Sequence, residues 1–329
     1  MHLIAEACTN HNGSLAKAKQ LVDIAIASGA GSVKFQIINP EELYLLRVRG
    51  EHGAWADNAV VAARRKAMLT DDEYHELAAY ARERGIALSG SIFGRKSLDL
   101  LCALDAPYIK IASTDCNNYP LLAEVASRGR KIILATGMAS LGEIERAVKT
   151  ITDAGNQDIV LLHCVSVYPC PPDLVNLPFI ATLRQAFGLP VGFSDHTPDS
   201  AAAIAALALG AEWFEKHFTW DRAAEGFDHA NSLNPEQLKR YGDDLRSASA
   251  ALAPAKKVGE KESGTRARAR RALHASRNIQ SGEVLTENDV LIVRPEGPLA
   301  PGDLALLLGQ TLRKPIAQFE PFSLEHLRV

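Results

Sequence analysis

The sequence predicts an α/β protein: a closed (β/α)8 barrel, or TIM barrel, followed by a small second domain. Short β-like runs alternate with helical runs through most of the 329 residues. Eight such βα units in roughly 250 residues match the size of this barrel. After a basic stretch, the pattern changes to short β-like runs with turns at Ser281-Gly282 and Pro301-Gly302. A doubly wound open sheet is the rival, but it usually has fewer strands, and no GxGxxG motif follows the first strand.

The eight expected strands are short and mostly apolar. They are His2–Cys8, Ser32–Gln36, Ile86–Ser91, Tyr108–Ile111, Lys131–Thr136, Ile159–His163, Val191–Phe193 and Ala211–His217. Helical signals separate them. Residues 14–28 carry apolar side chains at helical spacing, and Thr70 with Glu73 and Ser140 with Glu143 have the spacing of a capping box. Asn234-Pro235 fits an N-cap followed by a proline in the first turn.

Composition bounds the function and divides the chain. A net charge of -3 gives no sign of nucleic-acid or anionic-membrane binding. No signal peptide is visible and the five cysteines form no CxxC pair, which favours a cytoplasmic protein with reduced thiols.

We expect a barrel over residues 1–255, a solvated basic linker over 256–271 and the small domain over 272–329. Residues 39–68 are long for a βα connection and are expected to form a lid or an oligomer contact.

Two histidines follow neighbouring expected strands near the end of the barrel sequence. His196 lies in Ser194-Asp195-His196-Thr197 and His217 in Glu215-Lys216-His217-Phe218. Both imidazoles should emerge at the same end of the sheet, where catalytic groups of barrels lie. Two neutral imidazoles can hold a divalent metal and leave positions open for substrate, which predicts a Lewis-acid site. Isolated histidines such as His11 and His163 are instead expected to be hydrogen-bonded scaffolding.

Two lysines lie inside otherwise apolar strands. Lys34 and Lys110 would be costly to bury unless they are paired or face a ligand. Serines at nearby strand ends suggest a site for phosphate or carboxylate; they are Ser91, Ser113 and Ser194. Buried ion pairs with Glu6 or Asp115 are the less favoured alternative. Glu6, at the end of the first strand, is a candidate general base, with a structural ion pair as its alternative.

Short runs in a characteristic order and spacing resemble one family. In the first half they are Ile4-Ala5-Glu6, Asn10-His11-Asn12-Gly13-Ser14, Val33-Lys34-Phe35-Gln36, Tyr108-Ile109-Lys110-Ile111-Ala112-Ser113 and Cys116-Asn117-Asn118-Tyr119-Pro120. In the second half they are Ala135-Thr136-Gly137-Met138, Leu162-His163-Cys164, Tyr168-Pro169, Ser194-Asp195-His196-Thr197 and Glu215-Lys216-His217-Phe218-Thr219. Together they resemble the sialic acid synthase family, which makes N-acetylneuraminate and related nonulosonates. The tail, with Ser281–Leu285 and Val293-Arg294-Pro295, resembles that family's antifreeze-like SAF domain, a β-clip.

The resemblance implies an enzyme that condenses phosphoenolpyruvate with an open-chain N-acetylated amino sugar, such as N-acetylmannosamine, and releases phosphate by C–O cleavage. It implies a divalent metal, Mn²⁺ foremost with Mg²⁺ or Co²⁺ as alternatives, on His196 and His217. Phosphoenolpyruvate would contact Lys34, Ser91, Lys110, Ser113 and Ser194. Glu6 would handle protons or steer water, and the sugar would contact Gln36, Tyr168 and Asp228. Arg294 would reach the partner's barrel in a domain-swapped homodimer.

Three departures from the family pattern bear on the substrate. Ala135 stands where the family usually has a serine, and Ser166 where N-acetylneuraminate synthases commonly have an asparagine. The run Gly90–Gly94 also differs from the usual one. These changes leave open a different aldehyde acceptor, of the legionaminic or pseudaminic type. A metal-assisted pyruvate aldolase and an inactive sugar-binding homologue are further alternatives, although the charged residues and both histidines are present.

Overall fold

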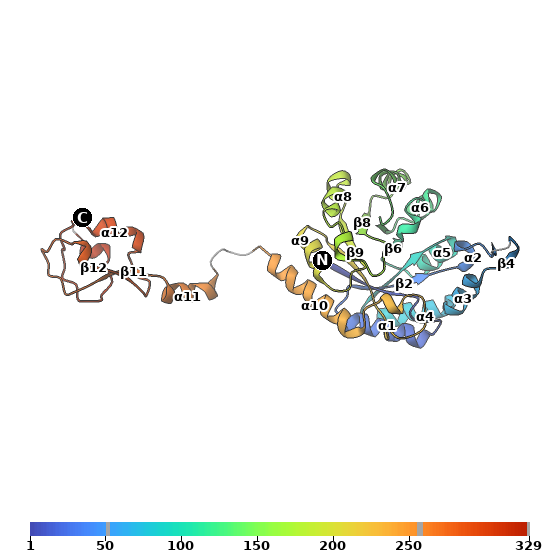
Figure 1. Cartoon of the computed structure of the whole chain (residues 1–329), viewed down its shortest axis with the longest axis horizontal. Coiled ribbons are helices and arrows are strands. Elements are labelled where there is room, and N and C mark those ends of the chain that lie inside the picture. The colour runs from blue at the N-terminus through green and yellow to red at the C-terminus, as the bar shows by residue number, and fades with distance from the viewer. Residues whose placement is uncertain (51–52, 255–258, 328–329) are drawn as a thin grey trace. The chain divides into compact units, whose positions relative to one another are not determined.

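The first compact unit is a closed barrel of eight parallel strands (Figure 1). The structure, a computed structural model, describes residues 1–50, 53–254 and 259–327, and its two compact units are Met1–Leu252 and Ala253–Val329. The barrel closes in the order β1-β10-β9-β8-β7-β6-β5-β2. These strands are β1 (His2–Cys8), β2 (Ser32–Ile37), β5 (Ala87–Ile92), β6 (Tyr108–Ile111), β7 (Lys131–Ala135), β8 (Ile159–Cys164), β9 (Val191–Asp195) and β10 (Trp213–His217). The TIM barrel and its eight strands are confirmed, with ends that differ by one or two residues.

Helices surround the barrel and begin where their capping residues predict. They are α1 (Leu15–Ala27), α4 (Asp71–Glu83), α5 (Arg95–Ala103), α6 (Tyr119–Ala126), α7 (Leu141–Asp153), α8 (Phe179–Phe187), α9 (Ala201–Ala208) and α10 (Pro235–Leu252), with 3-10 turns η1 (Ser113–Asp115), η2 (Pro172–Leu174) and η3 (His229–Asn231). Both predicted capping boxes form, at Thr70 and at Ser140. Asn234 and Gln237 exchange the same pair of bonds before α10. These bonds satisfy N–H groups that a helix start leaves free.

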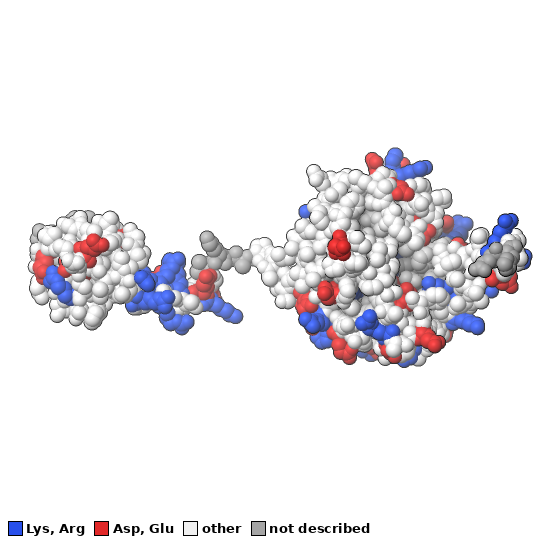
Figure 2. All heavy atoms as spheres, in the orientation of Figure 1, with Lys and Arg blue, Asp and Glu red and all other residues white. Residues whose placement is uncertain are grey.

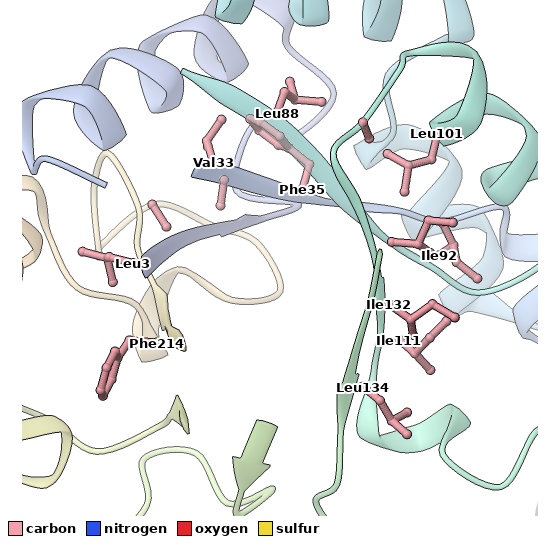
Figure 3. Packing of buried hydrophobic residues seen from close by; sticks show 14 of the residues in the cluster. Leu3, Val33, Phe35, Leu88, Ile92, Leu101, Ile111, Ile132, Leu134 and Phe214 are labelled. Carbon is pink, nitrogen blue, oxygen red and sulfur yellow. The ribbon is translucent and has the colours of Figure 1, made fainter. Parts of the chain in front are cut away.

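The main core lies between the strands and these helices. Alternate side chains of each strand point outward, so that Val33 and Phe35 of β2 and Ile111 of β6 meet helical side chains (Figure 3). The intervening residues face the barrel interior. Its lower part, at the amino ends of the strands, is filled by a second, smaller cluster that we call the apolar layer. We use this name for Ile4, Tyr108, Ile133, Val160, Leu162 and the partly buried Trp213; the cluster also contains Ala135 and Cys164, which lie further along β7 and β8.

Residues 39–68 form more than a loop. They contain α2 (Pro40–Leu43), the antiparallel pair β3 (Arg47–Arg49) and β4 (Trp55–Asp57), and α3 (Ala59–Ala67). Arg65 of α3 forms an ion pair with Glu41 of α2 at 2.5 Å. The insertion therefore has secondary structure of its own, and its predicted part as a lid or oligomer contact stays a prediction.

The second unit has its own small core. Its elements are α11 (Glu260–Ala269), β11 (Ala272–Ala275), β12 (Val290–Val293) and α12 (Leu304–Leu307), with 3-10 turns η4 (Glu287–Asp289), η5 (Pro301–Asp303) and η6 (Leu324–His326). β11 and β12 pair antiparallel, and Leu273, Ile279, Leu285 and Phe322 are buried between them and the following segments.

The expected basic linker is helical over most of its length. α11 spans Glu260–Ala269, which the linker prediction did not anticipate, and residues 256–258 lie outside the described part of the chain. Lysines and arginines gather on this helix (Figure 2), where Arg266 forms an ion pair with Glu296 at 2.8 Å. Across the described ranges, no helix is both long and apolar enough to span a membrane.

Candidate active site

A cavity of about 580 Å³ opens at the carboxyl ends of the barrel strands. Every predicted site residue of the barrel lines it; these residues are Glu6, Lys34, Gln36, Ser91, Lys110, Ser113, Ser166, Tyr168, Ser194, His196, His217 and Asp228. They come from segments as far apart in sequence as β1 and the loop after β10. Parallel strands bring them together because all carboxyl ends meet at one face of the barrel.

Four charged side chains form the floor of the cavity, and we call them the charged layer: Glu6, Lys34, Lys110 and Glu215. Lys34 forms an ion pair with Glu6 and lies 3.7 Å from Glu215, whose carboxylate is also 3.5 Å from Lys110. Each of these side chains is at most 5% exposed. Register contributes to the grouping, since β1 pairs Glu6 with Lys34 of β2 and with His217 of β10, two residues after Glu215.

The ion pairs correct the sequence-based preference. Pairing of the lysines was the less favoured interpretation, yet both lysines are paired and also face the cavity. Glu6 is one of these partners, as the less favoured interpretation proposed. Asp115 is not, because its carboxylate accepts hydrogen bonds from Asn118 and Thr114 instead. Glu215 was missed. The sequence could have indicated it, because Glu215 and His217 are two residues apart in an expected strand and therefore point to the same face.

Burial and neighbouring charge act differently on the two carboxyl groups. Burial raises the pKa of Glu6, against the attraction of Lys34. For Glu215 burial acts in the same direction, but Lys110 and Lys34 together overcome it and lower its pKa to about 2. These shifts favour the ionised form of Glu215 and make Glu6 the carboxyl of the charged layer that takes up a proton more readily.

Three serines at strand ends add hydroxyl groups to the cavity wall. Ser91 accepts a hydrogen bond from the Lys34 ammonium at 2.7 Å, and Ser194 donates to Glu215 at 3.1 Å. Ser113 accepts from the backbone N–H of Gly137 at 3.0 Å. A Cβ at Gly137 would lie 2.9 Å from that hydroxyl, so glycine allows this close approach.

The two predicted metal ligands are neighbours in the cavity wall, with their rings packed edge to face. The ring centroids of His196 and His217 are 5.3 Å apart, and the Tyr168 ring lies 4.0 Å from that of His196. His196 uses Nδ1 for a 2.7 Å hydrogen bond to the carbonyl of Val165, which leaves Nε2 for a ligand. Burial lowers the pKa of both imidazoles, so both are neutral near pH 7, the form that binds metal.

The donor set fits a divalent cation. Ligand atoms of Cys8, His217 and Asp228 lie within 4.8 Å of one another. One carboxylate oxygen of Asp228 is buried and has no hydrogen-bond partner among the described residues. Sequence reasoning had assigned Asp228 only to the sugar and had expected the cysteines to be reduced thiols, without a role in the site. Imidazole and carboxylate donors beside a water-accessible cavity suit a divalent metal.

The cavity wall also includes a residue that sequence reasoning did not select. Arg64 of α3 lines the cavity, donates to the Thr9 hydroxyl at 3.1 Å and lies 3.6 Å over the ring of Phe227. Its Nε is buried without a partner in the described ranges. Arg64 belongs to the insertion at residues 39–68, whose fold was not predicted.

The remaining predictions have separate outcomes. His163 points away from the cavity and bonds the carbonyl of Val175 at 2.7 Å, as expected for scaffolding. Ala135 lines the cavity as a buried methyl group, so it supplies no hydroxyl there. Arg294 is exposed on the second unit directly after β12. Its role toward a barrel stays a prediction.

Known proteins resemble both units. The profile of the NeuB family matches residues 21–257, and that of the SAF domain matches residues 270–328. The chain is 36% identical over 324 residues to the N,N'-diacetyllegionaminic acid synthase of Campylobacter jejuni, covering 95% of this chain and 96% of that protein. It is 30% identical over 351 residues to the N-acetylneuraminate-9-phosphate synthase of Drosophila melanogaster, covering 98% and 94%. The crystal structure of the Bacillus subtilis spore coat polysaccharide biosynthesis protein SpsE matches with a TM-score of 0.67 at 31% identity, covering 100% of this chain and 95% of that one.

Proposed function

The chain belongs to the NeuB family of phosphoenolpyruvate-condensing nonulosonic acid synthases and carries a C-terminal SAF domain, and from this premise we propose its reaction. Phosphoenolpyruvate condenses with an open-chain N-acetylated amino sugar, N-acetylmannosamine or a related hexose, to give a sialic-type acid and inorganic phosphate. One observation carries the proposal. The charged layer and two neutral imidazoles line a single cavity at the catalytic end of the barrel.

Phosphoenolpyruvate binding is assigned to the charged layer and its serines. The substrate carries a carboxylate and a phosphate, and the lysine ammonium groups of Lys34 and Lys110 with the hydroxyls of Ser91, Ser113 and Ser194 are suitable donors. Both lysines are already paired with carboxylates, so an incoming anion adds negative charge to a balanced group. Glu6, whose pKa is raised by burial, is the member of the charged layer best suited to accept a proton during the reaction.

The metal is assigned to His196 and His217, with Cys8 and Asp228 close by. When bound, Mn²⁺, with Mg²⁺ and Co²⁺ as alternatives, would supply Lewis-acid polarisation of the sugar's aldehyde oxygen. The Val165 carbonyl holds the His196 ring through Nδ1, which fixes the direction of its free nitrogen.

The bond changes then follow from the positions of these groups. The methylene carbon of phosphoenolpyruvate bonds to the aldehyde carbon, whose oxygen takes a proton. Water adds to the oxocarbenium-like carbon that this creates, and phosphate leaves as its C–O bond breaks. Glu6, which lines the cavity beside Lys34, would orient that water and accept its proton. Burial strengthens each of these electrostatic contacts.

Acceptor recognition is assigned to the outer part of the cavity. Gln36, Ser166, Tyr168 and Asp228 line it, and we add Arg64. Arg64 and Asp228 each keep one buried polar atom without a partner in the described part of the chain, one a donor and the other an acceptor. A hydroxyl or acetamido group can satisfy both at once. Arg294 would complete the site from the partner's SAF domain in a domain-swapped homodimer.

A substrate screen tests the proposal. Phosphoenolpyruvate is incubated with Mn²⁺ and N-acetylmannosamine, its 6-phosphate or diacetamido hexoses, and released phosphate and product mass are measured. Phosphoenolpyruvate with ¹⁸O in the bridging position should place that oxygen in the phosphate, as C–O cleavage requires. Product formed from free pyruvate without phosphate would instead establish an aldolase.

A further inference from the structure

Cys8 has an unusual backbone for its residue type. It ends β1 with φ +51°, in the left-handed region that non-glycine residues seldom adopt. The pairing of β1 with β2 is irregular between Glu6 and Cys8, as at a β-bulge. Bulges beside active sites often redirect a side chain, and a strained residue there calls for a functional explanation.

The redirected side chain contacts a predicted metal ligand. The sulfur of Cys8 lies 2.9 Å from Nδ1 of His217. The thiol can donate its proton to the Glu6 carbonyl, 3.9 Å away, and still accept from an imidazole N–H. Cys8 is fully buried and is not among the residues that line the cavity. Its sulfur is therefore placed against Nδ1 of the ring and outside the cavity lining.

The other imidazole is held in the same manner. Nδ1 of His196 bonds the Val165 carbonyl at 2.7 Å. Each of the two rings thus has its Nδ1 occupied by a protein group, and each has Nε2 left for the cavity. A histidine that binds metal through one nitrogen commonly donates its other N–H to a partner that fixes the tautomer and the ring orientation.

We propose that Cys8 is a positioning residue for the metal site, whose sulfur accepts the Nδ1–H of His217 and so presents Nε2 to the cation. The inference rests on the proposed function, because it requires His217 to bind metal. It explains why a cysteine occupies a left-handed position that glycine would take without strain. It also assigns Cys8 a role behind the ligand, and not as a ligand itself.

Two substitutions distinguish a Cys8 that positions the His217 ring from a Cys8 that only fills space in the core. Cys8→Gly removes the sulfur but suits the backbone, so the variant should fold. Cys8→Ser keeps a group that can accept the Nδ1–H. Co²⁺ and Mn²⁺ affinities are measured by calorimetry on the full chain, and Cys102→Ser on α5 is the matched control. Cys8→Gly should weaken metal binding about 10- to 100-fold, while Cys8→Ser should retain most of the affinity and the control all of it.

The Co²⁺ absorption spectrum supplies a readout that needs no activity. Wild-type protein should show visible bands of the bound ion that shift in Cys8→Gly, without a near-ultraviolet sulfur-to-cobalt charge-transfer band. Unchanged affinity and spectrum in Cys8→Gly would overturn the positioning role. A charge-transfer band in wild type that Cys8→Gly loses would make Cys8 a direct ligand, which also contradicts it. Failure of the wild-type protein to bind any divalent cation would overturn the metal site itself.

Discussion

The interior of the barrel has two levels made by the same strands. In the apolar layer lie Ile4 and Tyr108, and two residues further along their strands lie Glu6 and Lys110 of the charged layer. On β10 the step runs from Trp213 to Glu215. Both levels are buried and both point inward, because strand side chains alternate with a period of two.

The difference between the levels is chemical and not topological. The apolar layer contributes through burial of hydrocarbon, which stabilises the barrel without further requirements. The charged layer must overcome the desolvation of four ionisable groups, and ion pairing only offsets that cost. We therefore propose that the barrel keeps this layer at its catalytic end for binding. Substitutions at the two levels should therefore affect different measurements.

Loss of Lys34 should have the largest effect. Lys34→Met removes the ammonium that pairs with Glu6 and contacts Ser91. We expect kcat/KM for phosphoenolpyruvate to fall on the order of 10³-fold, as when a preorganised donor is removed. Stability should fall by about 3–5 kcal/mol because Glu6 stays buried without its partner. Steady-state phosphate release and urea unfolding measure the two effects.

A double variant separates those effects. Lys34→Met with Glu6→Gln should recover stability but not activity. Lys131→Met, at the amino end of β7 with an exposed ion pair to Asp158, is the control and should change neither quantity much. Recovered catalysis in the double variant would show that the charged layer is structural.

A substitution in the apolar layer should have the opposite pattern of effects, with stability lowered and activity unchanged. Ile133→Ala on β7 truncates a fully buried side chain and should lower the free energy of unfolding by about 2–5 kcal/mol. Activity per folded molecule and both KM values should stay unchanged, because Ile133 does not line the cavity. Urea unfolding and kinetics at a temperature below the transition give the result. A raised KM for either substrate would show that the two levels are coupled.

The buried imidazole of His11, which belongs to neither layer, should make the stability of the protein depend on pH. Burial lowers its pKa to about 4, against 6.5 for an exposed histidine. Between these values the unfolded chain binds more protons, so acidification from pH 6.5 to pH 4 should remove about 3 kcal/mol of stability. His11→Asn cannot titrate and should lose less over this range. Urea midpoints at several pH values compare the two proteins, and parallel curves would contradict this account.

The smallest expected effect concerns the cavity above the charged layer. Arg64→Leu should raise the acceptor KM about tenfold, as loss of a hydrogen bond from a charged donor does. The KM for phosphoenolpyruvate and the metal affinity should be unchanged. Arg65→Leu on the same helix is the control, since Arg65 pairs with Glu41 on the surface. Equal effects of the two substitutions would remove Arg64 from acceptor recognition.

Local sequence signals were sufficient for the barrel. Capping boxes at Thr70 and Ser140 and short apolar strands are determined by neighbouring residues, so their positions followed from spacing. The polar residues at strand ends met in one cavity because the closed sheet brings all its carboxyl ends together.

Features that depend on tertiary contacts were not predicted. The ion-pair partners of Lys34 and Lys110 could be identified only from the way the barrel strands pair. In the folded barrel Glu215 lies within 4 Å of both lysines, whereas Asp115 pairs with neither. The backbone of Cys8 has no local sequence signature. The helix that carries Arg64 does have one, its N-cap Asn58, which the treatment of residues 39–68 as a loop did not use. α11 was missed because its polar composition is also typical of a solvated linker.

The central claim is that the charged layer and its two imidazoles form a metal-dependent condensing site. Phosphate release from phosphoenolpyruvate, with an accepted amino sugar, tests it most directly when wild type and His217→Ala are compared with Mn²⁺ and with chelator. We predict release that needs sugar and metal in wild type and is lost in the folded variant. Undiminished release by His217→Ala under chelation would contradict the account.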